Sequence, residues 1–235
     1  MSDLLMTTPT GYASPAKAIY FFDEGTGEMK NLLGGKGAGL AAMTHAGLPV
    51  PAGFTITTEQ CLAYYNAGRR FPDGFDGKLS DAMRELETRT GKRLGDAKNP
   101  LLVSVRSGAR VSMPGMMDTI LNLGLNDTTV AVLAALTGNE RFAWDAYRRF
   151  IATFAEVVLG IEKQIFDRII EEAKTKLGVA TDPEVDVATW KLVVAEFARV
   201  VERESQRPFP QDVTEQLELA IKAVFDSWYS RRATD

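Results

Sequence analysis

Two hydrophobic patterns divide the chain near residue 126. Before that point, short apolar runs alternate with segments of helical periodicity, which predicts strands separated by helices. After it, apolar residues recur at helical spacing almost throughout, which predicts a bundle of packed helices. The pattern therefore predicts an α+β fold, with a mixed subdomain over residues 1–126, a helical subdomain over 127–228 and a short return segment over 229–235.

The first part carries signals for element boundaries. Gly47 stands where a glycine commonly ends a helix, and Leu40 and Met43 share one face of the segment before it. Thr57 followed by Gln60 predicts a capping box at the start of the next helix. Together these signals predict strands over 18–22, 53–56 and 101–105, and helices over 37–46, 57–64 and near 78–90.

Four apolar stripes mark the helices of the second part. We interpret them as the core of a bundle rather than a cofactor site, because aliphatic and aromatic residues at this spacing are typical of packed helices. Asp212 with Glu215 predicts a capped start of the last helix, after the linker over 208–210. The stripes are Phe150, Ile151, Phe154, Val157 and Val158; Ile165, Ile169, Ala173 and Leu177; Trp190, Val193, Val194, Phe197, Val200 and Val201; and Leu217, Ile221, Val224 and Trp228.

Composition and charge argue against several classes of protein. The chain has 235 residues with a net charge of −4, which argues against a nucleic-acid-binding protein. No apolar run approaches the length of a membrane span, and the N-terminus does not resemble a signal peptide. Cys61 is the single cysteine, so no internal disulfide forms, and its apolar surroundings predict a buried side chain. These features favour a cytoplasmic protein that binds neither nucleic acid nor membrane.

A strand followed by a glycine-containing loop gives the first candidate for anion binding. The run over 101–105 ends at Arg106, and Ser107 and Gly108 follow it directly. Backbone N–H groups can approach an anion where no Cβ intervenes, and arginine offers a rigid fork of donors. The alternative is a glycine-rich surface turn with a solvated arginine.

A second glycine-rich run gives another candidate. Lys36 stands among Gly34, Gly35 and two further glycines, just ahead of a predicted helix. It does not match a Walker A loop, since Lys30 stands where that motif has its first glycine and Gly37 where it has Ser or Thr. A lysine beside a helix N-terminus still suits a phosphate group. The alternative is a turn with an incidental surface lysine.

Together these stretches resemble the N-terminal nucleotide-binding domain of the pyruvate, phosphate dikinase family. The resemblance covers nearly the whole chain apart from the first dozen or so residues. The residues after Arg106 resemble the dikinases rather than the related phosphoenolpyruvate synthases. The matching segments are NLLGGKGAGLAAM (31–43), GLPVPAGFTITTEQCLAYY (47–65), PLLVSVRSGARVSMPGMMDTILNLGLND (100–127), RFAWDAYRRF (141–150) and AVFDSWYSRRA (223–233).

The resemblance implies a fold and a reaction. The fold is the N-terminal half of an ATP-grasp-like domain with an inserted helical bundle. The family binds ATP and Mg²⁺ and moves a phosphoryl group through a histidine on a separate domain of the same polypeptide. With inorganic phosphate and pyruvate, it forms AMP, pyrophosphate and phosphoenolpyruvate. The resemblance also implies Mg²⁺ ligands beyond residue 235, a homodimeric full-length enzyme, and weak ATP binding without turnover for this chain alone.

Site residues follow from the resemblance by motif position. Lys36 and Arg106 would contact and neutralise the polyphosphate. His45 lacks the sequence context of the carrier histidine, and a structural role near a helix end is expected for it. Arg149 is more simply explained as an exposed helix arginine or a partner in a bundle ion pair. The residues expected to bind the nucleotide are Gly34, Gly35, Ser107, Gly108, Gly115 and Met117, and no residue of this chain is expected to bind metal.

Two other functions stay open at this stage. The first is a phosphoenolpyruvate synthase or another dikinase-like phosphotransferase, which a requirement for inorganic phosphate would distinguish. The second is a non-catalytic module that senses nucleotides or binds another protein through its helical bundle. The resemblance also predicts that the chain is a fragment of a longer enzyme, with a naturally short paralogue as the alternative.

Overall fold

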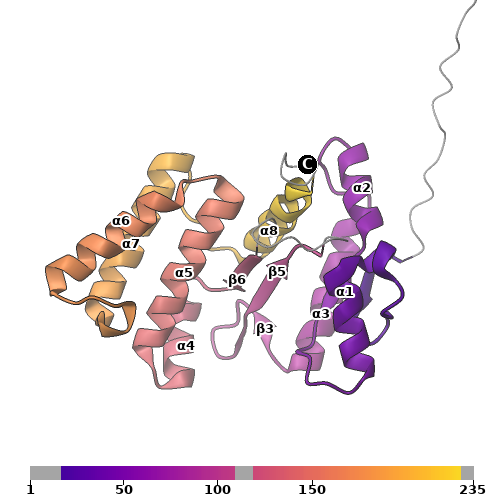
Figure 1. The fold of residues 1–235 in the computed structure, drawn as a ribbon, viewed down its shortest axis with the longest axis horizontal. Helices are drawn as coiled ribbons and strands as arrows, with labels where there is room; N and C mark the ends of the chain where they lie inside the picture. The colour runs from indigo at the N-terminus through magenta and orange to yellow at the C-terminus, as the bar shows by residue number, and fades with distance from the viewer. Residues whose placement is uncertain (1–16, 109–118, 229–235) are drawn as a thin grey trace, which may run out of the picture.

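Helices predominate in the structure and flank three short strand pairs (Figure 1). The computed structural model describes residues 17–108 and 119–228. The predicted mixed α+β class is confirmed. The elements are β1 (Ile19–Phe21), α1 (Lys30–His45), β2 (Phe54–Ile56), α2 (Thr58–Asn66), α3 (Phe75–Thr90), β3 (Arg93–Leu94), β4 (Pro100–Leu101), β5 (Val103–Arg106), β6 (Thr119–Leu123), α4 (Thr129–Thr137), α5 (Glu140–Leu159), α6 (Lys163–Leu177), a 3₁₀ turn (Asp182–Glu184), α7 (Val187–Ser205) and α8 (Val213–Ser227).

The strands pair locally within the described part of the chain. β1 pairs with β2 in antiparallel register, with Tyr20 opposite Thr55. β5 pairs antiparallel with β6, with Val105 opposite Ile120, and β3 pairs with β4 in parallel. The three predicted strand regions are therefore present, whereas β3 and β6 were not predicted.

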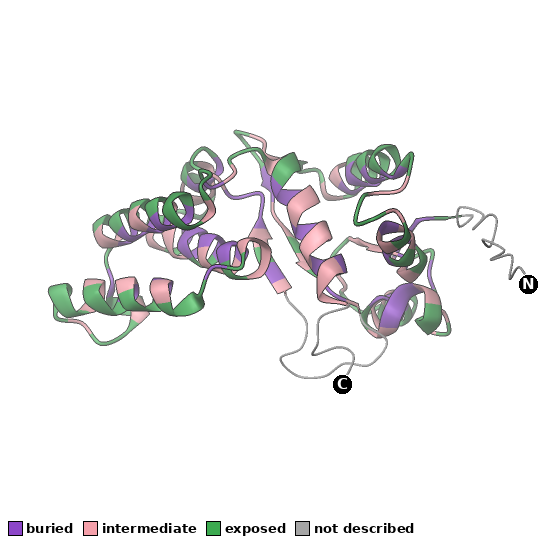
Figure 2. Ribbon diagram, turned by 90° about the horizontal axis from the view of Figure 1, so that it is seen from above, coloured by how far each residue is buried: buried purple, intermediate pink, exposed green. Residues whose placement is uncertain are grey.

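The helices over 129–205 pack as a bundle, as predicted. Figure 2 shows exposed residues along their outer faces and buried residues on the faces turned inward. The stripes on α5 and α7 contribute most of this core, including the fully buried Phe154 and Trp190. On α6 the predicted Ile165, Ile169 and Ala173 are partly buried and pack against this core, whereas Leu177 is exposed. The two buried residues of α6, Phe166 and Ile170, were not predicted. Phe209 of the predicted linker is also buried and packs edge-on against Phe150 and Phe154.

The last helix packs against α5 of its predicted subdomain and also against β5 and β6. Figure 1 shows α8 between the bundle and α1–α3, beside β5 and β6. The Tyr65 hydroxyl donates a hydrogen bond of 2.9 Å to the Phe225 carbonyl oxygen, which ties α2 to the end of α8. α8 therefore connects the mixed part of the molecule with its helical part. No helix in the described ranges has the length and apolar character needed to cross a membrane.

Of the two predicted helix caps, one is present in the structure and the other is not. Asp212 caps α8 as predicted, since its Oδ1 accepts hydrogen bonds from the N–H groups of Thr214 at 2.7 Å and Glu215 at 3.2 Å. The capping box at Thr57 was wrong, because its side chain makes no cap hydrogen bond. The Thr57 N–H donates to the Ala18 carbonyl, so this residue extends the β1–β2 ladder and its side chain is buried there.

The Asp212 cap gives a stability prediction. Asp212→Ala should lower the free energy of unfolding by about 1 kcal/mol, because two N–H groups at the start of α8 lose their acceptor. The measurement is urea denaturation followed by circular dichroism. Glu218→Ala is the matched control on the same helix, where only a 3.8 Å surface ion pair with Lys222 is lost. Equal effects from the two substitutions would contradict the capping role.

Candidate functional site

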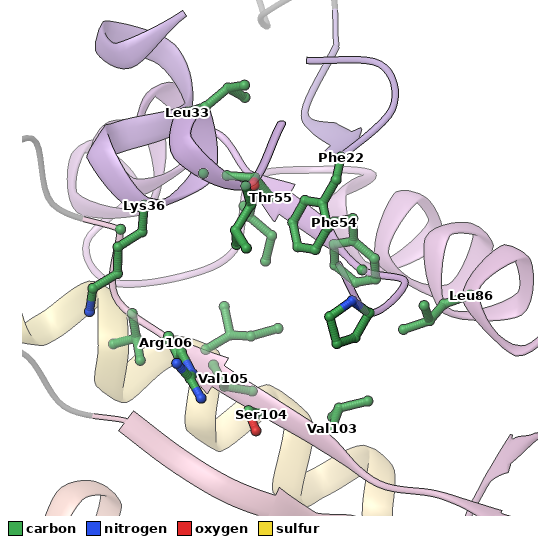
Figure 3. Close-up of a pocket in the computed structure, with 18 of the residues that line it drawn as sticks. Phe22, Leu33, Lys36, Phe54, Thr55, Leu86, Val103, Ser104, Val105 and Arg106 are labelled. Carbon is green, nitrogen blue, oxygen red and sulfur yellow. The ribbon is translucent and has the colours of Figure 1, made fainter. Parts of the chain in front are cut away.

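A cleft of about 780 Å³ separates α1 and β2 from β5 and α8 (Figure 3). Its walls are mainly apolar, with Phe54 and Ile56 from β2 and Val103 and Val105 from β5. A volume of this size suits a nucleotide-sized ligand. Further apolar lining residues come from α3 and α8 and include Met83, Leu86, Leu217, Ile221, Val224 and Phe225.

Two cations from distant parts of the sequence enter this cleft. Figure 3 shows the side chains of Lys36, on α1, and Arg106, at the end of β5, at the same end of the pocket. Within residues 17–108 and 119–228, they are the only charged residues that line the cleft. Neither residue forms an ion pair or a side-chain hydrogen bond with another described residue, since none of those observed involves them. The cleft thus has a positive end, and no carboxylate stands among the lining residues that the structure describes.

The two glycine-rich motifs touch each other through their backbones. Gly34 has a positive φ of 70°, and it interrupts α1 so that Lys36 follows a kink. A Cβ atom on Gly34 would lie 1.6 Å from the carbonyl oxygen of Gly108. A Cβ atom on Gly108 would in turn meet the Leu33 carbonyl oxygen at 3.4 Å. The absence of a Cβ atom at these two glycines therefore lets the segment after Arg106 lie directly against the kinked start of α1 that carries Lys36.

A third glycine sets how closely α1 approaches β2. A Cβ atom on Gly37 would lie 2.8 Å from both branches of the Thr55 side chain. The buried face of α1 accordingly consists of small residues and Leu33. The predicted shared face of Leu40 and Met43 is real, but it lines the cleft instead of the core.

Ser107 is held by the end of α8. Its side chain is buried, and its hydroxyl accepts a hydrogen bond of 3.1 Å from the indole N–H of Trp228. This contact joins the loop after β5 to a residue 121 positions later in the chain. It gives Ser107 a structural partner, and the predicted contact of Ser107 with a nucleotide stays a prediction.

The family follows from comparison with known proteins. The sequence model of the family described as "Pyruvate phosphate dikinase, AMP/ATP-binding domain" matches residues 30–70 and 67–235. The chain belongs to this family. Pyruvate, phosphate dikinase of Entamoeba histolytica is 50% identical over 217 residues, which are 92% of this chain and 24% of that protein. The Clostridium symbiosum protein of the same name is 49% identical over 219 residues, 93% of this chain and 25% of that protein.

A plant protein extends the same relationship. Pyruvate, phosphate dikinase 2 of Zea mays is 50% identical over 229 residues, which are 96% of this chain and 26% of that protein. The chain therefore spans about a quarter of the length of these relatives. The resemblance predicted from the sequence motifs is confirmed.

The other residues singled out in the sequence lie in different parts of the structure. Gly35 adjoins the kink in α1 and is partly buried. Gly115 and Met117 lie outside the described residues. Arg149 pairs with Asp145 at 3.2 Å and is 57% exposed, which confirms its interpretation as a bundle arginine. His45 lies within 2.8 Å of the Gly25 carbonyl oxygen through Nε2 and thereby ties the end of α1 to the preceding loop.

The described residues hold no preformed cluster of metal ligands. Magnesium is held by oxygen ligands, chiefly carboxylates and water molecules. Within residues 17–108 and 119–228, no three His, Cys, Asp or Glu side chains gather as a metal site. What this cleft does offer is two cations at one end of an apolar groove, a combination that suits an anionic group joined to a less polar one.

Cys61, on α2, lines the floor of the cleft. The sequence motifs did not predict this position. It is 2% exposed, as predicted for a buried side chain. Burial, with a smaller contribution from Asp226, raises the pKa of its thiol to about 12. The thiolate, which is the reactive form of cysteine, is therefore scarce at neutral pH.

Cys61 should resist alkylation in the native protein. At pH 8 we expect labelling by iodoacetamide to be negligible on the time scale that modifies an exposed thiol, because the thiol is both buried and protonated. The measurement is mass spectrometry of peptides that contain Cys61, before and after unfolding in urea. Rapid labelling of the native protein would show that the floor of the cleft opens to solvent.

Proposed function

We propose that this chain is the ATP-binding part of a pyruvate, phosphate dikinase. The observation that carries the proposal is the positive end of the cleft, where Lys36 and Arg106 lie without a carboxylate among the described lining residues. Membership in an AMP/ATP-binding domain family supports the same ligand. In this proposal the chain forms the first half of an ATP-grasp-like domain, and ATP binds in this cleft. The second half of the domain would come from another part of the full-length enzyme.

In this proposal the two cations have different roles. Lys36 supplies a mobile point charge, and Arg106 supplies a planar fork that can hold two phosphate oxygens. Phosphoryl transfer depends mainly on positioning and on neutralising charge, so both side chains would act on the polyphosphate directly. The apolar walls formed by Phe54 and Val105 would accept less polar parts of the nucleotide.

The other steps of the reaction require parts outside this chain. In the proposed reaction, a histidine on another domain accepts a phosphoryl group from ATP and later passes it to pyruvate. Inorganic phosphate takes a second phosphoryl group, which yields pyrophosphate and AMP. The Mg²⁺ ligands and the carrier histidine would lie beyond residue 235. We expect the full-length enzyme to be a cytoplasmic homodimer.

The decisive experiment uses the native protein purified from its source. An immunoblot with an antibody against this chain first gives its size, and a band several times larger than 25.7 kDa is expected. The purified protein is then incubated with ATP and pyruvate, with and without inorganic phosphate. We expect AMP, pyrophosphate and phosphoenolpyruvate to form only when phosphate is present.

Other outcomes would replace the proposal. Phosphoenolpyruvate made without added inorganic phosphate would identify a synthase. A native protein near 25.7 kDa that binds nucleotide without turnover would identify a sensing or interaction module. Absence of nucleotide binding by the native protein would remove the assignment of the cleft altogether.

A further inference from the structure

Arg106 reaches the cleft without a side-chain partner to fix its direction. Its guanidinium forms no ion pair or side-chain hydrogen bond with another described residue. A long side chain of this kind has many rotamers, so the backbone from which it leaves decides where the guanidinium is found. Arg106 is the last residue of β5, where it stands opposite Thr119 of β6. Because the ends of an element open most readily, the residues that follow Arg106 decide how well it is held.

Two contacts support the segment directly after Arg106. Ser107 is fully buried whereas Arg106 is exposed, so the two side chains have different surroundings. The Ser107 hydroxyl accepts a hydrogen bond of 3.1 Å from the indole N–H of Trp228. At the next position, the backbone of Gly108 lies against Gly34 of α1. Trp228 therefore supplies a directional side-chain contact one residue away from Arg106.

Trp228 is itself held at the end of α8, which lies beside β5 (Figure 1). Its backbone N–H donates a hydrogen bond of 3.1 Å to the Phe225 carbonyl oxygen. The same oxygen accepts the 2.9 Å hydrogen bond from the Tyr65 hydroxyl of α2. Nearby, Arg69 Nε lies 3.7 Å from the Asp226 carboxylate. The indole therefore projects from a helix end that is tied to α2 and the turn after it.

We propose that Trp228 is a positioning residue for Arg106. The indole N–H holds the Ser107 hydroxyl, and Ser107 fixes the backbone from which the Arg106 side chain enters the cleft. Trp228 acts through this hydrogen bond and not by contact with the polyphosphate. The inference rests on the proposed function, because it gives Trp228 a role in the ATP partial reaction. The helical stripe in the sequence predicts only a core position for the same residue.

Kinetics of the full-length enzyme test this role. Trp228→Phe removes the indole N–H and keeps an aromatic ring in its place. We expect kcat of the ATP partial reaction to fall about 10-fold and KM for ATP to change less than about twofold. A misplaced guanidinium loses contacts of the transition state more than contacts of the bound substrate. Ser107→Ala removes the acceptor and should have the same effect, and both variants should keep the rate of the pyruvate partial reaction.

Double variants separate positioning from a purely structural role. Trp228→Phe should have no further effect when Arg106 is already alanine, because the indole acts through that side chain. It should likewise have no further effect in the Ser107→Ala enzyme. Full additivity in either background would overturn the proposal. Trp144→Phe, at a partly buried indole on α5, is the matched control and should leave both partial reactions unchanged.

Hydrogen exchange tests the contact without reference to catalysis. Peptides that cover residues 101–107 should exchange about 5-fold faster in Trp228→Phe than in the wild type, as expected when one hydrogen bond is lost. Peptides that cover residues 140–160 should be unchanged, which shows that the variant is folded. Equal exchange over 101–107 in the two proteins would contradict the proposal.

The outcomes distinguish this inference from the proposed function. An Arg106→Ala enzyme that keeps its ATP partial reaction would refute the proposed function, and this inference with it. A slow Arg106→Ala enzyme beside a fully active Trp228→Phe enzyme would refute the inference alone.

Discussion

Replacing Gly34 with alanine is expected to lower the free energy of unfolding by about 3 kcal/mol or more. Two effects add. A residue with a Cβ atom is strained at a φ of 70°. The same Cβ atom would lie 1.6 Å from the backbone oxygen of Gly108, and no change of rotamer can move it away. Urea denaturation of the purified native protein measures the loss.

Gly39 provides a matched control for Gly34 on the same helix. A Cβ atom there would meet no other atom within 4 Å, and its φ is not positive. Gly39→Ala should therefore leave stability unchanged or raise it by about 0.5–1 kcal/mol, because alanine favours the helix. If both variants were equally stable, the backbone contact between the two glycine motifs would not exist in solution.

Replacing Arg106 with alanine is expected to slow the ATP partial reaction of the full-length enzyme by about 100-fold or more. Arg106 has no ion pair with the described residues and is exposed, so folding should be nearly unaffected. The pyruvate partial reaction should keep its rate, because it does not use the polyphosphate. Exchange of labelled AMP into ATP and exchange of labelled pyruvate into phosphoenolpyruvate measure the two partial reactions.

Two further variants make the Arg106 result specific. Arg106→Lys keeps the charge but loses the planar fork, so an intermediate rate is expected. Arg199→Ala removes an arginine that is 73% exposed and pairs only with Glu196 in the described part of the chain. It should leave both partial reactions unchanged. An ATP partial reaction that survives Arg106→Ala would refute the assignment of the positive end of the cleft.

Local spacing in the sequence accounts for most of the elements. The stripe on α7 predicts its buried face residue by residue, because a helix repeats every 3.6 residues whatever surrounds it. Short strands are harder to predict: β6 carries the exposed Leu121 and the positive-φ Asn122 in five residues. Thr57 shows how tertiary context overrides a local signal, since its backbone joins the strand ladder and its hydroxyl does not cap the helix.

Both sequence motifs and the fold were required to identify the candidate site. Each glycine-rich run suggested phosphate binding by itself, but only the structure brings Lys36 and Arg106 into one cleft. The roles of Gly34 and Gly108 depend on a contact between segments more than 70 positions apart, which no local pattern encodes. The walls from α3 and α8 were not predicted for the same reason. Their apolar residues look like ordinary helix core in the sequence.

The position of α8 has a consequence for the order in which the protein assembles during synthesis. The Tyr65 hydroxyl can form its hydrogen bond only after Phe225 has been synthesised, 160 residues later in the chain. At ribosomal rates this takes roughly 10–30 s. Neighbouring helices of the bundle can pack with one another as soon as each emerges, because their contacts are close in sequence. Until α8 is made, the apolar sides of β5 and β6 lack the contacts that it provides. A nascent chain stalled within the bundle would therefore be exposed to chaperones and aggregation at its oldest part rather than its newest.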